Sequence, residues 1–291
     1  MKVLITGVAG QLGSHLAFEL AKLSWMELLM SDKTVLDITD AEQVDAYFKK
    51  NLPDIVVNTA AFTSVDFAEK APSQAISVNH IGAANLARSS AQYNCAMIQL
   101  STDYIFDGGS NRPYVEDDLP RPLNIYGVSK LEGERVVMQY NSKHIILRTS
   151  WLFSDSGKNF YLTMQNLLKA KKSISVVNDQ FGAPTFVLDL VNTIRKILEM
   201  LNQQKILGWG VYHYAGYPFT SWFDFAKEIQ KAIHPKGIGC EILGISTDLY
   251  GSTASRPLYS CLDSSKAFNN FAVEPSDWIM RLKEIAIKTK N

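Results

Sequence analysis

The first half of the sequence alternates short, continuously apolar runs with longer helical patterns. Strands are expected at KVLIT (2–6), ELLMS (27–31), IVVNTA (55–60), MIQLST (97–102) and IILRTS (145–150), with helices near 12–22, from about 39, and near 80–93 and 128–140. Strands that are apolar along their whole length are typical of a parallel sheet covered by helices on both faces. The crossovers between such strands are right-handed. The pattern therefore predicts a doubly wound α/β fold.

Loops and aromatic residues become more frequent after Trp151. This half is expected to contain a helix at 158–171, a strand at ISVV (174–177), helices near 187–201 and 221–233, and the segments GVYHYAG (210–216) and 234–257. Such a composition suits a smaller lobe that shares a cleft with the sheet domain. We predict that residues 1–150, with about 186–208, form the sheet domain, and that 151–185 and 209–291 form mainly the smaller lobe.

The composition of this 291-residue chain argues against several classes of function. Lys and Arg together number 29, as do Asp and Glu, so the net charge is zero and there is no basic excess for nucleic acid. No apolar run approaches the roughly 18 residues of a membrane span. The start MKVLITG lacks the long apolar region of a signal peptide, and three widely spaced cysteines suit a reducing compartment. We expect a cytoplasmic protein with no nucleic-acid or membrane partner.

A glycine-rich loop follows the N-terminal strand. In TGVAGQLGSHL, Gly7, Gly10 and Gly13 lie three residues apart, between a strand and a helix. Glycine allows the backbone to approach a pyrophosphate closely, and the helix N-terminus offers free N–H groups and a positive dipole end. The spacing is GxxGxxG rather than the GxGxxG fingerprint of dinucleotide-binding folds, and a tight turn without a ligand is the alternative. The order of strand, loop and helix favours a nucleotide.

The end of the second strand carries residues suited to a nucleotide ribose. Asp32 can accept hydrogen bonds from the adenine ribose of NAD, whereas its neighbour Lys33 can receive the 2′-phosphate of NADP. Both residues are present, so the choice between NADH and NADPH stays open. Asp37, in LDITD, is either an adenine contact or a residue that caps the next helix.

A third group of candidate residues lies near the fourth and fifth strands. Tyr126 and Lys130, in NIYGVSKLEGE, are four residues apart and share one face of a helix. Most such pairs are surface neighbours, but a glycine loop and the Ser-Thr strand end at 101–102 make this pair specific. A nearby ammonium and an oxidised nicotinamide favour the phenolate of tyrosine. Tyr126 could then give a proton to a carbonyl oxygen as hydride reaches its carbon, with Thr102 bonded to that oxygen and Lys130 also holding the nicotinamide ribose.

These motifs resemble the extended short-chain dehydrogenase/reductases, and within them the dTDP-4-dehydrorhamnose reductases. The resemblance extends from residue 1 to about 285 through GQLG, LDITD, NTAAFTSVDFAE, VNHIGAANLA, STDYIFDG, NIYGVSKLEGE, RTSWLF, VVNDQFGAPT and ASRP, in that order. It implies a Rossmann domain that binds NADPH or NADH and a smaller lobe that binds a dTDP-sugar. The implied reaction reduces the 4-keto group of dTDP-4-dehydro-β-L-rhamnose to give dTDP-L-rhamnose for cell-surface polysaccharide.

The resemblance also assigns roles to individual residues. Thr102, Tyr126 and Lys130 would be catalytic. Relatives that eliminate water carry Thr-Asp-Glu where this chain has Thr-Asp-Tyr, so the loop suits reduction. The implied cofactor contacts are Gly7, Gly10, Gln11, Leu12, Gly13, Asp32, Lys33, Asp37, Ile38, Ala60, Ala61, Thr63, Tyr126 and Lys130. The implied substrate contacts are Asp103, Tyr104, Trp151, Asn159, Gln180 and Arg256.

Two of the substrate assignments have structural alternatives. An indole can cover an apolar sugar face, but Trp151 could equally be a core residue after a strand. Arginine suits a pyrophosphate, although a lone arginine such as Arg256 is more often at the surface.

Metal binding is one point at which this chain differs from the family that it resembles. Some members bind Mg²⁺ at a dimer contact through glutamates, and the matching positions here are His15 and Leu188. Leucine cannot ligate a hard cation, so no metal site is expected. The oligomeric state is left open, with a homodimer as one option.

Two other functions remain as alternatives. The first is a non-catalytic subunit resembling the regulatory subunit of methionine adenosyltransferase. The second is a sister dTDP-keto-sugar reductase, such as a dihydrostreptose synthase.

Overall fold

A six-stranded parallel sheet forms the centre of the larger domain in the computed structural model, which describes residues 1–205, 208–234 and 239–288. The strand order is β10-β5-β4-β3-β1-β2. The strands are β1 (Lys2–Thr6), β2 (Glu27–Ser31), β3 (Ile55–Asn58), β4 (Ala96–Thr102), β5 (His144–Thr149) and β10 (Gly210–His213). All five neighbouring pairs are parallel.

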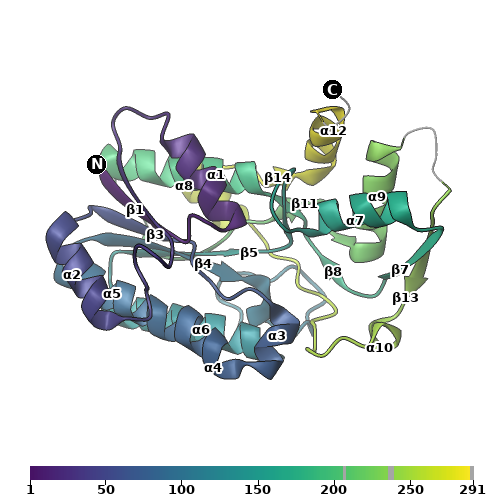
Figure 1. Cartoon of the computed structure of the whole chain (residues 1–291), viewed down its shortest axis with the longest axis horizontal. Coiled ribbons are helices and arrows are strands. Elements are labelled where there is room, and N and C mark those ends of the chain that lie inside the picture. The colour runs from purple at the N-terminus through teal and green to yellow at the C-terminus, as the bar shows by residue number, and fades with distance from the viewer. Residues whose placement is uncertain (206–207, 235–238, 289–291) are drawn as a thin grey trace.

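Helices cover both faces of this sheet (Figure 1). One face carries α1 (Gln11–Leu20) and α8 (Val187–Asn202), and the other carries α2 (Ala41–Asn51), α5 (Ala83–Gln92) and α6 (Ile125–Tyr140). Each layer has its own apolar core, because the inner strands β1, β3, β4 and β5 are buried on both sides, whereas the edge strand β2 is partly exposed. The predicted doubly wound α/β fold is confirmed.

The order of the strands places a change of direction in the middle of the sheet. The chain moves outward from β1 to β2 and then returns to β3 on the opposite side of β1. In open α/β sheets, ligands bind beyond the carboxyl ends of the strands at such a switch point. The glycine loop after β1 and the residues after β3 therefore flank the expected ligand position.

A short helical segment between β3 and α5 was not expected from the sequence. It consists of α3 (Val65–Lys70), α4 (Pro72–Ile76) and a π-helical turn (Ser77–Gly82). Pro72 lies in the first turn of α4, where its missing N–H removes no helical hydrogen bond. These turns lie beside α6, so they face the region of Tyr126.

The smaller lobe lies beyond the carboxyl end of the sheet (Figure 1). Its β7 and β13 pair in parallel, and its core is rich in aromatic residues, among them Phe153, Phe225 and Trp278. Its principal elements are α7 (Phe160–Ala170), β7 (Ser173–Val177), α9 (Trp222–Ile233), β13 (Glu241–Ile245), α10 (Thr247–Tyr250) and α12 (Trp278–Lys288). Three further two-stranded pairs are β6 (Leu152–Phe153) with β9 (Thr185–Phe186), β8 (Phe181–Gly182) with β12 (Thr220–Ser221), and β11 (Gly216–Tyr217) with β14 (Ser276–Asp277).

Two elements after residue 209 pack with the sheet domain. Strand β10 pairs with β5, and α11 (Ser265–Phe271) places Phe271 against Tyr212 of β10, with ring centroids 4.5 Å apart. The predicted division assigns both elements to the smaller lobe, whereas their apolar side chains join the core that α1 and α8 share. In the described part of the chain, no helix has the length and apolar character needed to cross a bilayer.

Candidate active site

The glycine loop is packed directly against the residues that follow β3. Gly7 has a left-handed φ of 73°, and a side chain there would lie 2.6 Å from the Ala60 nitrogen. A side chain at Gly13 would lie 2.3 Å from the Gly7 carbonyl oxygen. Gly10 begins α1 without a side-chain cap, so the N–H groups of the first turn at Gln11 and Leu12 are available to an anion. The loop therefore fits a pyrophosphate.

The expected ribose-binding residues lie in a turn after β2. Asp32 accepts hydrogen bonds from the Thr34 nitrogen at 2.8 Å and its hydroxyl at 2.6 Å, and these bonds lower the pKa of Asp32. The side chain of Lys33 is 83% exposed, and its ammonium lies 3.7 Å from Asp37. Ile38 is buried in the core. The Asp32 carboxylate and the Lys33 ammonium are thus both accessible to a ligand.

The carboxylate of Asp37 accepts hydrogen bonds within its own turn. Its carboxylate accepts from the nitrogen and the hydroxyl of Thr39, at 3.0 and 2.7 Å, and these bonds lower its pKa. The helix cap is the neighbouring Asp40, which accepts from the Gln43 nitrogen at 3.0 Å.

Buried side-chain amides form hydrogen bonds to the backbone of the segment after β3. Asn58 accepts a hydrogen bond from the Ala60 nitrogen at 3.2 Å. Asn79, in the π-helical turn, accepts from the Phe62 backbone nitrogen and donates to the Phe62 carbonyl oxygen. Ala60 and Ala61 are partly exposed, and Thr63 is exposed. These small side chains therefore border open space next to the glycine loop.

The three expected catalytic residues converge at the carboxyl end of β4. Thr102 is the last residue of β4, and Tyr126 lies in the first turn of α6, where the Asn124 side chain accepts from the Gly127 nitrogen at 2.8 Å. The Thr102 hydroxyl lies near that of Tyr126 and acts to lower the pKa of Tyr126. Lys130, one turn further along α6, donates to the Leu100 carbonyl oxygen of β4 at 2.6 Å.

Burial sets the protonation of Tyr126 and Lys130 in opposite ways. It raises the pKa of Tyr126 to about 12, an effect that the Thr102 hydrogen bond partly offsets. It lowers the pKa of Lys130 to about 8, and the charge of Glu134 opposes that change. Desolvation therefore favours the neutral phenol in the protein without cofactor, whereas the phenolate is the form expected beside an oxidised nicotinamide. A neutral Tyr126 is the form that can donate a proton.

The neighbours of Thr102 have distinct positions. Asp103 is buried and bonded to the hydroxyls of Ser260, at 2.6 Å, and Thr102, at 3.1 Å. Burial raises the pKa of Asp103 to about 7. Tyr104 is partly exposed and packs edge-on against Tyr126, with ring centroids 6.0 Å apart. Tyr104 thus borders the site, whereas Asp103 ties the strand end to the smaller lobe.

Two buried hydroxyls near Thr102 have no partner within the described residues. They are Ser101, in β4, and Thr149, which lies opposite Thr102 at the end of β5. Unpaired buried hydroxyls are rare in folded proteins. Their position at the carboxyl edge of the sheet fits a bound polar ligand.

Trp151 begins the smaller lobe. It has a left-handed φ of 45°, which is uncommon for a residue other than glycine. Its ring stacks on Trp222 with centroids 3.4 Å apart and planes 8° apart. The residue as a whole is partly exposed, while its indole also lies against Gly182.

Asn159 and Gln180 are both bonded to other parts of the smaller lobe. Asn159 caps α7 by accepting from the Leu162 nitrogen at 3.0 Å, and its amide donates to the Ser154 and Ser156 carbonyl oxygens. Gln180 is buried and donates to the Thr247 hydroxyl at 3.0 Å.

Arg256 is paired with a carboxylate from the sheet domain. Its guanidinium bonds to both oxygens of Asp66 in α3, at 2.6 and 3.2 Å. It also donates to the Ala254 carbonyl oxygen at 3.3 Å. Asp66 was not among the expected site residues, because nothing local in VDFAE indicates a partner so far along the chain.

The expected absence of a metal site concerns His15 and Leu188. His15 contacts the Gln11 carbonyl oxygen and the Ser156 hydroxyl, at 2.8 and 3.3 Å, while Leu188 packs on the core of the smaller lobe. Among residues 1–205, 208–234 and 239–288, no group of three or more metal-binding side chains is found.

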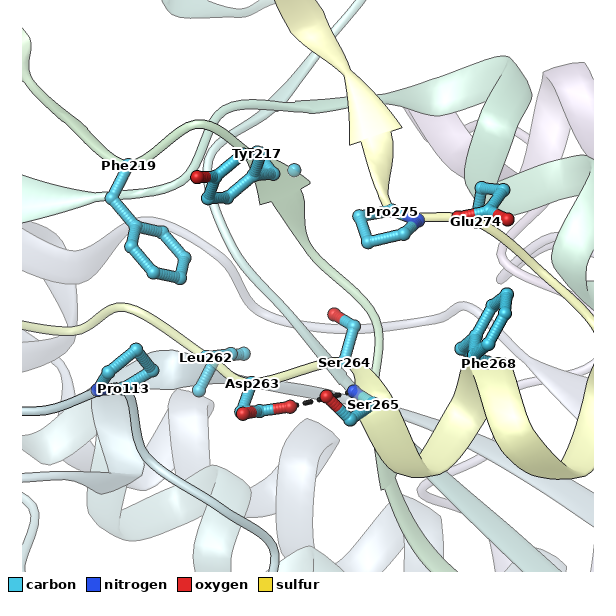
Figure 2. Close-up of a pocket in the computed structure, with 11 residues that line it drawn as sticks. Pro113, Tyr217, Phe219, Leu262, Asp263, Ser264, Ser265, Phe268, Glu274 and Pro275 are labelled. Carbon is cyan, nitrogen blue, oxygen red and sulfur yellow. Dashed lines mark hydrogen bonds between the residues drawn. The ribbon is translucent and has the colours of Figure 1, made fainter.

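A separate hollow is lined by residues of β11 and α11 and by neighbouring loop residues (Figure 2). It measures about 320 Å³, and its walls include Tyr217, Phe219, Leu262, Phe268 and Pro275. None of the expected catalytic, cofactor or substrate residues lines it. The candidate active site is therefore the open edge at the ends of β1, β3 and β4.

Comparison with known proteins agrees with this geometry. Residues 1–290 match the family model described as RmlD substrate binding domain. The chain is 40% identical to the dTDP-4-dehydrorhamnose reductase of Aggregatibacter actinomycetemcomitans, with 98% of each chain covered. The chain belongs to the dTDP-4-dehydrorhamnose reductase family. The predicted resemblance is confirmed.

Another relative in this range is the spore coat polysaccharide biosynthesis protein SpsK of Bacillus subtilis, 37% identical over 97% of this chain and 96% of that protein.

Solved structures of the reductase family have the same fold over the whole length. The dTDP-4-dehydrorhamnose reductase of Clostridium acetobutylicum superposes with a TM-score of 0.92 at 36% identity, covering 100% of both chains. The Bacillus anthracis enzyme, solved in complex with NADP, gives 0.90 at 38% identity, covering 99% of both.

Proposed function

We propose that this protein reduces the 4-keto group of dTDP-4-dehydro-β-L-rhamnose with NADPH or NADH, giving dTDP-L-rhamnose for cell-surface polysaccharide. The observation that carries the proposal is the meeting of Thr102, Tyr126 and Lys130 at the carboxyl end of β4. This edge lies beside the glycine loop at the switch point of the sheet. Membership of the reductase family supports the same reaction and substrate.

The cofactor would lie along the edge from the glycine loop to β4. When bound, NAD(P)H supplies the hydride. Gly7, Gly10 and Gly13 admit its pyrophosphate, and the first turn of α1 stabilises the negative charge. Asp32 and Lys33 provide an acceptor for a ribose and a cation for a 2′-phosphate, so both cofactors are used. The loop from Ala60 to Thr63 borders the cofactor and Asp37 lies on the adenine side, whereas Ile38, whose side chain is buried, would contribute only its backbone.

Tyr126 acts as the general acid. Its pKa of about 12 keeps the phenol protonated at neutral pH, so a proton is available at the hydroxyl oxygen. Thr102 bonds to the same carbonyl oxygen of the sugar and holds it in line with that proton. The ammonium of Lys130 favours the phenolate left after proton transfer and donates to the nicotinamide ribose.

The smaller lobe binds the sugar nucleotide. We assign residues 151–185 and most of 209–288 to this role, and 1–150 with about 186–208 to the cofactor. Trp151, backed by Trp222, presents its indole to the sugar ring, and Tyr104 borders the same space. Arg256 reaches the diphosphate, whereas Asn159 and Gln180 shape the nucleotide end. Tyr104 lacks a carboxylate base, which suits reduction rather than elimination of water.

The remaining assignments concern metal and location. We expect activity without a divalent cation, because His15 and Leu188 offer no carboxylate. Excess EDTA should leave most of the rate, and a complete loss restored by magnesium would contradict this. A cytoplasmic location is supported by three cysteines that are all free and buried.

One reaction tests the proposal. The protein is incubated with dTDP-4-keto-6-deoxyglucose, a 3,5-epimerase and either NADH or NADPH. Loss of reduced-cofactor absorbance that requires the epimerase, with the NMR spectrum of dTDP-L-rhamnose, is the expected result. A product of another configuration would indicate a sister reductase. Absence of turnover with both cofactors would exclude the proposed reaction.

A further inference from the structure

Asp66 joins the two lobes at the edge of the candidate site. Its two oxygens accept from the Arg256 guanidinium at 2.6 and 3.2 Å, and one of them also accepts from the Ala254 nitrogen at 3.0 Å. Asp66 lies in α3, directly after the loop that borders the cofactor. Its carboxylate therefore fixes both the backbone and the side chain of the segment that carries Arg256.

Glu69, at the next turn of α3, holds the start of α6. Its carboxylate accepts from the Ile125 nitrogen at 2.8 Å, one residue before Tyr126. Asn124, which caps α6, donates its side-chain amide to the Ser255 carbonyl oxygen at 2.8 Å. Hydrogen bonds thus join the Arg256 segment, α3 and the first turn of α6 to one another next to Tyr126.

The exposure of the Asp66 pair indicates more than a surface ion pair. The Arg256 side chain is only 17% exposed, whereas that of Asp66 is 46% exposed. The hydrogen bonds to Arg256 lower the pKa of Asp66, so the carboxylate is charged at neutral pH. A guanidinium has five N–H donors in a fixed plane. Two of those of Arg256 bond to Asp66, and its Nη1 group also donates to the Ala254 carbonyl oxygen at 3.3 Å. The plane is thereby set while other donors remain for an anion.

We propose that Asp66 and Glu69 are positioning residues, which place the Arg256 guanidinium and the Tyr126 hydroxyl on opposite ends of one substrate. This inference rests on the proposed function and deepens it. Asp66 acts on binding of the diphosphate through Arg256. Glu69 acts on the chemical step by holding the first turn of α6. Because the two carboxylates belong to one short helix, the diphosphate and the keto group are held at a set separation.

A split between binding and rate tests the two roles. Asp66→Asn keeps the shape but removes the charge, and we expect the Kd of dTDP and the KM of the keto-sugar to rise about tenfold, with kcat nearly unchanged. Glu69→Leu removes an acceptor, and we expect kcat to fall about tenfold with the Kd of dTDP unchanged. Glu69→Gln retains an acceptor oxygen and is expected to restore kcat.

A double-mutant cycle excludes a merely structural effect. If Asp66 acts through Arg256, adding Asp66→Asn to Arg256→Gln should weaken dTDP binding no further. Additive losses, tighter dTDP binding by Asp66→Asn, or equal changes in kcat for both carboxylate variants would overturn the proposal. NADPH affinity, expected to be unchanged, serves as the control for folding. Calorimetry measures dTDP binding without turnover. A failure of the proposed reaction would therefore show only in the activity assay of the wild-type protein.

Discussion

The sheet domain and the smaller lobe hold their expected site residues in different ways. At the sheet edge, Thr102, Tyr126 and Lys130 are grouped within one strand end and one helix; Lys130 donates to Leu100 of β4, and Thr102 bonds to the adjacent Asp103. In the smaller lobe, Asn159 caps a helix and Gln180 bonds to Thr247. A parallel sheet brings the ends of its strands to one edge, whereas an irregular lobe must use its polar side chains to hold its own loops.

This difference has a consequence for mutation. A substitution at the sheet edge removes a chemical group from an intact scaffold, so the loss should appear in rate. A substitution in the smaller lobe also removes a structural bond, so stability and binding should change together. The variants below separate these outcomes.

The largest effect is expected for Tyr126→Phe. The ring still packs against Tyr104, but proton donation is lost, and general acid catalysis contributes about 10²–10⁴-fold. That loss corresponds to roughly 3–5 kcal/mol of barrier. Single-turnover kinetics should show it in kcat, with NADPH binding preserved.

Lys130→Ala is the matched comparison for Tyr126→Phe. Because Lys130 is assigned to both the acid and the ribose, kcat should fall and the cofactor Kd should rise. Near wild-type turnover by Tyr126→Phe would mean that another group is the acid, with Tyr104 the first candidate.

Asn159→Ala should change stability as well as binding. Loss of a helix N-cap costs about 1 kcal/mol, and the bonds to the 154–156 loop are lost with it. Thermal unfolding should reveal a lower Tm. Asn159→Asp keeps the cap, so it should recover most of the stability. If Asn159→Asp were stable but bound dTDP far more weakly, the side chain would act mainly on the ligand.

Asp103→Asn should alter the pH dependence of stability. The folded pKa of Asp103, about 7, is above its ordinary value of 3.8, so the folded protein binds more protons between these values. This group therefore makes the protein less stable as pH rises from about 4 to 7. The Tm of Asp103→Asn relative to wild type should increase over that range. A constant difference would show that Asp103 ionises normally.

The smallest effect is expected for Lys33→Ala. The side chain is highly exposed, so loss of one phosphate contact should weaken NADPH only about two- to fivefold. NADH binding should be nearly unchanged. Equal weakening of both cofactors, measured by fluorescence titration, would remove Lys33 from the 2′-phosphate site.

Much of the sheet domain could be predicted from local sequence patterns. Continuous apolar runs identified β1 to β5, and the four-residue spacing of Tyr126 and Lys130 placed them on one helical face. The start of α6 was expected near 128 but lies at Ile125, because the Asn124 cap extends the helix. The segments α3 and α4 were missed, since they are too short for a clear helical period.

The amino-acid sequence by itself determined the α/β fold, the glycine loop and the grouping of Tyr126 with Lys130, because periodicity and spacing act within a few turns of one element. Only the tertiary structure decided that β10 and α11 join the sheet domain, that Asp103 meets Ser260, and that Arg256 meets Asp66. The last two pairs are 157 and 190 residues apart in the chain. Such contacts depend on how the lobes pack against each other, and no local pattern carries that information.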